Sequence, residues 1–223
     1  MTHAFFVTGT DTGVGKTYAV AALLHRIRKE GLPALGLKPI ASGVDADGKN
    51  EDVEALRAAS SLVLPEETLN SYLFSPAIAP HLAAAEAKRE IHFVSIVKAL
   101  ASAKTIASEK GVVLVEGVGG FRVPLGSDGD SADLAVLLGL PLILVVGMRL
   151  GCINHALLTV EAIEARGLKL SGWIANAITE EMPYFEQNVA TLKARIDAPL
   201  LGVLPVGLSS EPAAAAKYLS LPF

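Results

Sequence analysis

Short apolar runs recur along the chain, and segments with helical patterns lie between them. Several of these runs are apolar at consecutive positions instead of alternating with polar residues, which is typical of strands that a parallel sheet buries on both faces. The predicted strands cover residues 4–7, 34–37, 112–115, 142–146, 173–175 and 200–203. Because helices separate these strands, we predict an α/β fold in three layers, with a mostly parallel sheet between helices on both faces.

The clearest predicted helix follows the first strand. Val20, Leu23, Leu24 and Ile27 are apolar at the i, i+3, i+4 and i+7 positions of one helical face, and Gly31 ends the segment. Further helices are expected over residues 94–109, 154–166 and 213–216. The chain has 223 residues without a linker or an internal repeat, so we expect a single domain over residues 1–223.

Composition excludes several classes of protein. Apolar residues make up 51% of the chain and charged residues 19%, which excludes a disordered chain. The net charge is -4 and no basic block is present, so nucleic acid is not an expected partner. A single cysteine, Cys152, excludes an intrachain disulfide and a cysteine-rich zinc site. No uncharged apolar stretch reaches the roughly 18 residues of a membrane-spanning helix, so we expect a cytoplasmic enzyme or switch without a membrane partner.

Residues 8–17 carry the strongest chemical signal, because they join the first strand to the first helix with the sequence Thr8-Gly9-Thr10-Asp11-Thr12-Gly13-Val14-Gly15-Lys16-Thr17. In such a loop the backbone N–H groups surround phosphate oxygens, a lysine reaches the β- and γ-phosphates, and a hydroxyl binds Mg²⁺. Here Lys16 and Thr17 supply these groups. Five residues separate Gly9 from Gly15, one more than in the usual pattern, so the segment is a variant phosphate loop (P-loop).

Two polar residues follow the second predicted strand. Lys38 stands directly after this strand and Ser42 lies in the turn that follows. The carboxyl ends of parallel strands face the same crevice, so Lys38 is expected to bring a second positive charge to the γ-phosphate. The alternative is a lysine on the solvated surface, which is the common environment for this residue type. The turn with Ser42 favours the functional interpretation.

Two carboxylates are candidates for binding Mg²⁺. Glu116 directly follows the apolar strand at residues 112–115, which is the Walker B arrangement that offers an oxygen ligand to the metal. Asp52 lies at the start of a helical stretch that extends through Ser60. A helix N-terminus stabilises an acidic residue without any metal, so both explanations of Asp52 remain open at this point.

The last candidates lie after the final two strands. Asn176 follows residues 173–175, and its amide could pair with the N6/N7 edge of adenine. Residue chemistry alone favours the simpler explanation that this asparagine serves a turn. The segment Leu204-Pro205-Val206 after the last strand is equally ambiguous.

Together these segments resemble the dethiobiotin synthetase family of P-loop NTPases. The resemblance rests on motifs that occur in the family's order: Gly9-Thr10-Asp11-Thr12 with Val14-Gly15-Lys16-Thr17, Lys38-Pro39-Ile40-Ala41-Ser42-Gly43, Glu116-Gly117-Val118-Gly119-Gly120, Gly151-Cys152-Ile153-Asn154-His155 and Trp173-Ile174-Ala175-Asn176. A phosphate loop alone would be unspecific, whereas five ordered motifs are highly specific. With a weaker match at Leu204-Pro205, the resemblance covers nearly the whole chain.

The resemblance implies a reaction in biotin synthesis. An amine of 7,8-diaminononanoate takes up CO₂ as a carbamate, and a carbamate oxygen attacks the γ-phosphate of Mg-ATP to give a carbamic-phosphoric anhydride. The second amine then closes the ring and releases dethiobiotin, ADP and phosphate. The family also implies a homodimer, in which residues 151–154 of one subunit bind the carboxylate of the substrate held in the neighbouring subunit.

The resemblance also implies the role of each matching residue. Lys16 and Lys38 would be catalytic, and Thr17, Asp52 and Glu116 would hold Mg²⁺. Substrate would be bound by Thr12, Ser42, Gly151, Cys152, Ile153 and Asn154. The nucleotide would be bound by Gly13, Val14, Gly15, Lys16, Thr17, Tyr18, Asp52, Glu116, Gly117, Val118, Gly119, Asn176, Ala177, Pro205, Val206, Gly207 and Glu211.

Two other classes of protein share parts of this pattern. Switch ATPases of the partition or septum-site type usually carry a second lysine five residues before the phosphate-loop lysine, and here that position is Asp11. A regulatory module that only binds nucleotide would have no need for Lys38 and Ser42. The sequence therefore favours an enzyme over both alternatives.

Overall fold

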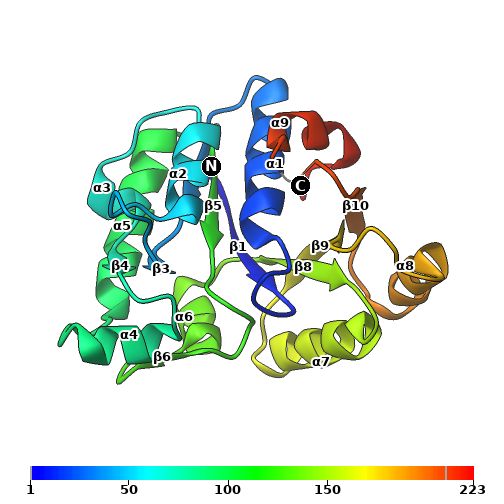
Figure 1. Cartoon of the computed structure of the whole chain (residues 1–223). Coiled ribbons are helices and arrows are strands. Elements are labelled where there is room, and N and C mark those ends of the chain that lie inside the picture. The colour runs from blue at the N-terminus through cyan, green and yellow to red at the C-terminus, as the bar shows by residue number, and fades with distance from the viewer. Residues whose placement is uncertain (1, 209) are drawn as a thin grey trace.

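A six-stranded parallel sheet forms the centre of the computed structural model, which describes residues 2–208 and 210–223 (Figure 1). Its strands lie in the order β10-β9-β8-β1-β5-β2, and every neighbouring pair is parallel. The strands are β1 (His3–Gly9), β2 (Ala34–Leu37), β5 (Val112–Glu116), β8 (Leu142–Met148), β9 (Leu170–Ala177) and β10 (Leu200–Leu204). Each of the six predicted strands is present, so the predicted α/β fold is confirmed.

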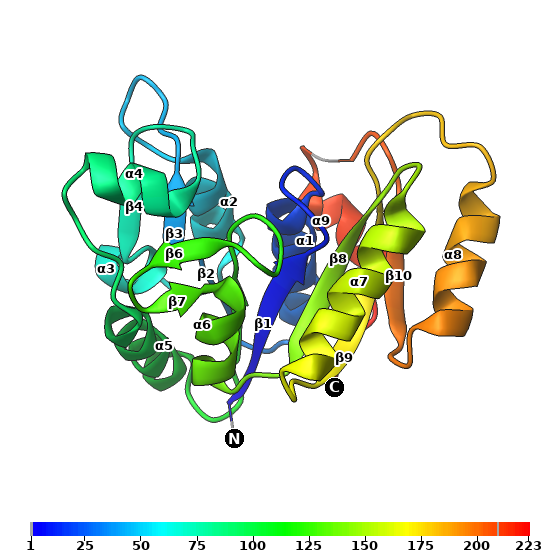
Figure 2. The same cartoon turned by 90° about the horizontal axis from the view of Figure 1, so that it is seen from below.

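Helices cover both faces of this sheet (Figure 2). One face carries α1 (Lys16–Lys29), α2 (Glu51–Ala59) and α9 (Pro212–Ala215), and the other carries α5 (Phe93–Ala107), α6 (Ser131–Leu138) and α7 (Cys152–Ala165). Strands β5 and β8 are buried at every position because they lie inside the sheet, beneath both helical layers. This double burial explains why the strands are apolar at consecutive positions.

The predicted helices are present with small differences at their ends. Helix α5 ends at Ala107 and not at residue 109, because Ser108 adopts a positive φ of 61° that interrupts the helical backbone. Helix α7 begins at Cys152, two residues earlier than predicted, after Gly151 caps it with a φ of 94°. The predicted helix at residues 213–216 is α9, which continues into the 3₁₀ helix η1 (Ala216–Tyr218).

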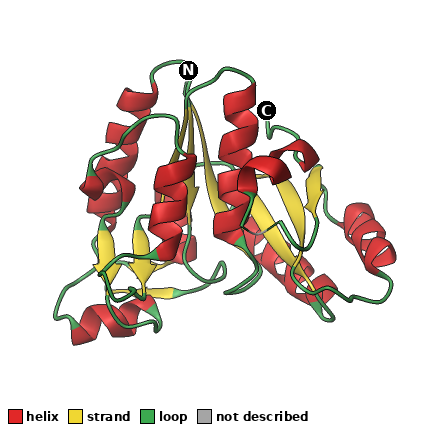
Figure 3. Ribbon diagram, turned by 45° about the horizontal axis from the view of Figure 1, so that its top comes forward, coloured by secondary structure: helices red, strands yellow, loops and turns green. Residues whose placement is uncertain are grey.

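Several shorter elements were not predicted. They are the helices α3 (Glu66–Leu69), α4 (Pro80–Glu86), α6 and α8 (Phe185–Arg195), the parallel pair β3 (Ile40–Ser42) and β4 (Tyr72–Phe74), and the antiparallel pair β6 (Pro124–Gly126) and β7 (Gly129–Asp130) (Figure 3). A second apolar cluster, which includes Tyr72, Phe74 and Phe93, holds β3, β4, α4 and α5 together. These elements extend the fold beside the carboxyl end of β2.

The register of the sheet brings the candidate residues together. Val7 of β1 lies opposite Glu116 of β5, and Leu37 of β2 lies opposite Val115. Lys38 and Glu116 therefore leave the sheet at the same level, beside the start of the phosphate loop. Within residues 2–208 and 210–223, no helix is long and apolar enough to cross a membrane.

Candidate active site

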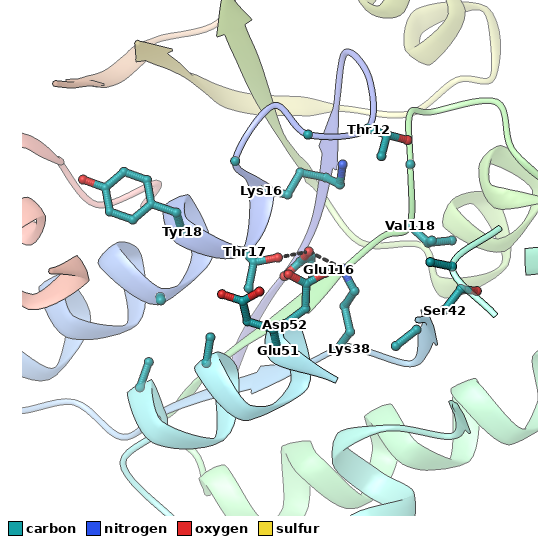
Figure 4. A pocket seen from close by; sticks show the side chains of 18 of the residues that line it. Thr12, Lys16, Thr17, Tyr18, Lys38, Ser42, Glu51, Asp52, Glu116 and Val118 are labelled. Carbon is teal, nitrogen blue, oxygen red and sulfur yellow. Dashed lines mark hydrogen bonds and ion pairs between the residues drawn. The ribbon is translucent and has the colours of Figure 1, made fainter. Parts of the chain in front are cut away.

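A cleft of about 1010 Å³ opens at the carboxyl ends of β1, β2 and β5. The phosphate loop and the first turn of α1 line it with Thr12, Gly13, Gly15, Lys16, Thr17 and Tyr18. The neighbouring strand ends and α2 line it with Lys38, Ser42, Asp52, Glu116, Val118 and Gly119. Twelve of the residues predicted for the site therefore face one cleft, although they come from four separate parts of the sequence (Figure 4).

The phosphate loop depends on glycine at two positions. Gly13 and Gly15 have φ values of 72° and 81°, which side chains rarely allow. A Cβ atom at Gly15 would also lie 2.2 Å from the amide nitrogen of Asn176. This close approach lets the loop turn directly into α1, where backbone N–H groups are available for an anion.

Lys16 is buried and poised at the end of this loop. Its ammonium group donates a hydrogen bond of 2.9 Å to the backbone carbonyl oxygen of Asp11. Burial, with a further contribution from the positive charge of Lys38, lowers the pKa of Lys16 to about 8. An anionic ligand beside Lys16 would oppose both effects and favour its charged form.

Lys38 lies at the centre of a polar cluster with the buried Glu116, the partly exposed Asp52 and Thr17. Its ammonium group is 2.9 Å from Asp52 Oδ2 and also contacts Glu116 Oε1, which accepts a 2.8 Å hydrogen bond from the Thr17 hydroxyl. Lys38 is 4% exposed, so it is not a solvated surface lysine. Burial acts to lower the pKa of Lys38, but the two carboxylates hold it above its usual value.

The two carboxylates of this cluster differ in environment. Glu116 is 1% exposed, and burial raises its pKa despite the opposing charge of Lys38. Burial acts in the same direction on Asp52, but the charge of Lys38 holds the pKa of Asp52 below its usual value. Asp52 also lies in the first turn of α2, so the helix-start explanation and the proximity to the site are both correct.

This cluster has the chemistry of a magnesium site. Glu116 Oε2 is buried and has no hydrogen-bond partner among the described residues, and the hydroxyl of Thr17 and the carboxylate of Asp52 lie beside it. Mg²⁺ prefers such oxygen ligands and usually takes only one or two from the protein, with the rest from phosphates and water. In the described parts of the chain, no group of three or more His, Cys, Asp or Glu side chains could hold a metal ion. The oxygen atoms of Thr17, Asp52 and Glu116 fit a magnesium ion that takes its remaining ligands from phosphates and water.

The other side of the cleft begins at Ser42. Its hydroxyl is buried and has no hydrogen-bond partner among the described residues. Ala77, Ile78 and Pro80, just before and within α4, form the adjacent apolar wall. This side of the cleft therefore offers a hydroxyl next to an apolar surface, and the sequence did not indicate its wall because α4 carries no recognisable motif.

Asn176 supports the phosphate loop from below. It is 4% exposed, and its amide nitrogen donates a 2.9 Å hydrogen bond to the carbonyl oxygen of Val14. Asn176, Val14, Gly117 and Ala177 do not line the cleft itself. Asn176 thus has a clear structural contact, which leaves its amide oxygen free of any hydrogen bond to a described residue.

The candidate residues of the C-terminal segment lie outside the lining of the cleft. Pro205, Val206 and Gly207 follow β10, and Glu211 is the residue before α9. None of them lines the cleft, whereas their neighbours Ser210 and Pro212 do. Sequence reasoning missed these two residues because no motif singles them out.

The segment at residues 151–154 lies outside the cleft of its own chain. Gly151 is exposed, Cys152 is buried beneath it, and Ile153 and Asn154 lie in the first turn of α7. Two residues before Gly151, Arg149 forms an ion pair of 2.7 Å with Asp11 in the phosphate loop. Sequence reasoning assigned no role to Arg149, although it is a charged residue just after a buried strand, the signal that pointed to Lys38 and Glu116.

The fold and the site define a P-loop protein that is built to bind a nucleotide. Residues 3–214 match a protein-family model described as an AAA domain. Two solved structures share the fold: a ParA family ATPase from Chlorobium tepidum (TM-score 0.57, 13% identity, 96% of this chain and 90% of that chain) and the septum site-determining protein MinD from Pyrococcus horikoshii (TM-score 0.56, 16% identity, 97% and 86%). At these identities the likeness shows the fold alone.

Curated relatives identify the particular family. ATP-dependent dethiobiotin synthetase BioD of Aromatoleum aromaticum is 54% identical over 99% of this chain and 98% of the relative. The proteins of the same name from Ralstonia nicotianae (54% identity, 90% of this chain and 87% of the relative) and Pseudomonas paraeruginosa (49%, 98% and 96%) are similarly close. The chain belongs to the ATP-dependent dethiobiotin synthetase family, which confirms the resemblance seen in the sequence motifs.

Proposed function

We propose that this protein forms dethiobiotin from 7,8-diaminononanoate, CO₂ and ATP, and releases ADP and phosphate. The observation that carries the proposal is the convergence of Lys16 and Lys38 on one cleft, beside the Ser42 hydroxyl, which has no hydrogen-bond partner in the described parts of the chain. A module that only binds nucleotide needs the first of these lysines, whereas an acceptor that attacks the γ-phosphate needs a second positive charge and a group that orients it.

The reaction proceeds in three steps. One amine of the substrate attacks CO₂ and loses a proton to give a carbamate. A carbamate oxygen then attacks the γ-phosphorus, and the bond to the leaving ADP breaks. In the last step the second amine attacks the carbonyl carbon of the mixed anhydride, phosphate leaves, and the ring closes with loss of a proton.

The two lysines and Ser42 have separate roles in these steps. Lys16, at the start of α1, binds the β- and γ-phosphate oxygens. Lys38 is held between Asp52 and Glu116, so its charge is fixed where negative charge develops on the transferring group. Ser42 and Thr12 orient the carbamate from the other side of the cleft.

Thr17, Asp52 and Glu116 would hold Mg²⁺ when Mg-ATP binds. The metal supplies neutralisation of phosphate charge and a fixed geometry for the polyphosphate chain. Two observations support this assignment: Glu116 Oε2 has no hydrogen-bond partner among the residues that the structure describes, and the oxygen atoms of Thr17 and Asp52 lie close to it. Glu116 and Asp52 also keep Lys38 in its charged form, because both carboxylates raise its pKa.

The adenine end of the nucleotide is assigned to Asn176, Ala177 and the C-terminal segment with Pro205, Val206, Gly207 and Glu211. Asn176 lies opposite Leu204 in the pairing of β9 with β10, so Ala177 and Pro205 leave the sheet side by side. The amide oxygen of Asn176 remains available for the exocyclic amine of adenine, while its amide nitrogen holds Val14.

A homodimer completes the site. The carboxylate of the substrate would bind backbone N–H groups at Gly151, Cys152, Ile153 and Asn154 of the neighbouring subunit, at the N-terminus of α7. The position of this segment outside its own cleft supports a contribution across a subunit interface. Each chain folds as one P-loop domain over residues 1–223, and the reaction takes place in the cytoplasm, where ATP is available.

The direct test is ATP turnover with and without each of the other substrates. We expect ADP release only when both 7,8-diaminononanoate and bicarbonate, as the source of CO₂, are present with Mg²⁺. A switch ATPase would hydrolyse ATP at the same rate without them, and that result would contradict the proposal.

A further inference from the structure

Asp11 makes three contacts that hold the tip of the phosphate loop. Its carboxylate Oδ1 accepts a 2.8 Å hydrogen bond from the backbone N–H of Thr12, and its carbonyl oxygen accepts the 2.9 Å hydrogen bond from Lys16. The second carboxylate oxygen, Oδ2, lies 2.7 Å from a guanidinium nitrogen of Arg149. Through its side chain and its backbone carbonyl, this one residue thus connects Thr12 of the cleft wall, Lys16 and the distant Arg149.

Arg149 lies in the loop between β8 and α7, directly after the strand β8 that neighbours β1. The phosphate loop is also bonded to β8 itself, because the backbone N–H of Thr10 donates a 3.1 Å hydrogen bond to the carbonyl oxygen of Val145. The side chains of Arg149 and Asp11 are 43% and 48% exposed. Such an exposed pair adds little to the overall stability of a protein, so its value lies in where it holds the chain.

We propose that Arg149 is a positioning residue for the phosphate loop. It holds the Asp11 carboxylate in the orientation that fixes the Thr12 amide and the peptide to which Lys16 is anchored. Arg149 does not line the cleft, so it acts through Asp11. The identity of the ligand as ATP rests on the proposed function. The role of Arg149 in positioning the loop rests only on the contacts described above.

Within one chain, the same pair connects two regions that the proposed dimer would use in different sites. Arg149 precedes the segment at residues 151–154, which serves the neighbouring site, while Asp11 belongs to the loop of its own site. The two residues are 138 positions apart and belong to different loops. Their ion pair therefore joins two regions of the chain that no helix or strand connects directly.

The test measures the affinity of a non-hydrolysable ATP analogue by calorimetry, with Mg²⁺ and without 7,8-diaminononanoate. Two substitutions break the pair: Arg149→Met removes the positive partner, and Asp11→Asn removes the negative one while keeping an oxygen for the Thr12 amide. If the pair positions the loop, both substitutions weaken binding by about two- to fivefold, and the double variant is no weaker than either single variant.

A purely electrostatic role gives the opposite sign for one variant. Loss of the Arg149 charge would weaken binding of the anionic nucleotide, but loss of the Asp11 charge would tighten it, and the two effects would add. Tighter binding by Asp11→Asn, or unchanged binding by Arg149→Met, would overturn the positioning role.

Two controls make the result specific. Arg149→Lys keeps the ion pair and is expected to retain most of the affinity. Arg57→Met breaks an ion pair of equal length, 2.7 Å to Glu66, in which the arginine is 39% exposed and does not face the cleft; the affinity of this variant for the ATP analogue should equal that of the unmodified protein.

High salt should remove the difference in affinity between Arg149→Met and the unmodified protein, because it screens exposed pairs. These binding measurements would stand even if the protein formed no dethiobiotin, so failure of either proposal can be recognised separately.

Discussion

The carboxylate of Asp52 lies 2.9 Å from the ammonium group of Lys38, although Asp52 also belongs to the first turn of a helix. The structure therefore confirms that Asp52 starts a helix and also places it at the candidate site, while its role toward Mg²⁺ stays a prediction. Helix α2 places the Asp52 carboxylate against Lys38, which follows β2. Asp52, Lys38 and Glu116 together form a charged cluster in the cleft.

The first prediction concerns the two carboxylates of this cluster. Glu116→Gln and Asp52→Asn keep the shape of each side chain and remove its charge. Each variant should therefore need at least about tenfold more Mg²⁺ for half-maximal activity. Because both carboxylates would serve one ion, the double variant should lose less than the two single effects combined. If Asp52→Asn needs no more Mg²⁺ than the unmodified protein, Asp52 does not bind the metal, and its role is limited to the ion pair with Lys38 and the start of α2.

Removal of Lys38 should affect both rate and stability. Lys38→Ala is expected to lower the catalytic rate by about 100-fold or more, with a much smaller loss of nucleotide affinity, because its charge acts mainly in the transition state. It should also destabilise the unliganded protein by about 3–5 kcal/mol, since Glu116 would remain buried without its partner.

A second substitution separates these two effects of Lys38. The double variant Lys38→Ala with Glu116→Gln removes the unpaired charge, so its thermal unfolding temperature should recover while its activity stays lost. Recovery of activity together with stability would show that Lys38 matters only for folding, and loss of nucleotide affinity at an unchanged rate would also contradict its role.

The pKa of Lys16 predicts how stability and binding change with pH. In the folded protein this pKa is lowered to about 8 from 10.5, so the unfolded chain binds more protons between these two values. The free energy of unfolding without nucleotide should therefore rise between about pH 8 and 10.5, by on the order of 3 kcal/mol from this group. Lys16→Met should lack this rise in a series of denaturant titrations.

Nucleotide affinity should change in the opposite direction over the same range. Phosphate binding favours the charged form of Lys16, so the affinity for the ATP analogue should fall as the pH rises through about 8. Lys16→Met should bind weakly with no such fall. If nucleotide affinity depends on pH in the same way in the variant and in the unmodified protein, a group other than Lys16 titrates in this range.

The shared site can be tested with a mixed dimer. A Lys38→Ala chain is combined with a chain carrying Gly151→Glu, and each parent homodimer should be inactive. If residues 151–154 serve the neighbouring subunit, the mixed dimer regains one intact site. That site combines the unmodified Lys38 of one chain with the unmodified segment 151–154 of the other. If each site lies within one chain, mixing restores nothing.

The geometry at Gly151 calls for a second variant in this experiment. A glutamate at this position has open space around its Cβ but must adopt the positive φ of 94°, which strains the backbone. Asn154→Glu places the same charge at an exposed helical position without that strain. Both variants should give the same result when they are mixed with Lys38→Ala.

The central part of the fold could be predicted because its signals are local. Runs such as residues 112–115 are apolar at every position since both faces of the strand are covered, and the phosphate loop combines glycine, lysine and threonine at short spacing. The strand-end rule then placed Lys38 and Glu116 in one crevice, which their register confirms. These inferences need only neighbouring residues and the geometry of a parallel sheet.

The rest depends on contacts between distant segments. The pairing of β3 with β4 joins residues about 30 positions apart, and each strand has only three residues, too few for a recognisable pattern. Sequence reasoning likewise could not find the contact of Asn176 with Val14, or that of Arg149 with Asp11, because nothing near either residue indicates its partner. Such contacts arise only when the completed sheet brings loop ends together.

The most direct test of the account is a mass-spectrometric measurement of product. The protein is mixed with 7,8-diaminononanoate, bicarbonate and Mg-ATP, and dethiobiotin is measured alongside ADP, with Lys16→Ala as the control that keeps the fold but loses the phosphate-binding charge. We expect dethiobiotin and ADP in equal amounts from the unmodified protein, and at least about 100-fold less of both from the variant. ADP without dethiobiotin, or equal product from Lys16→Ala, would contradict the account.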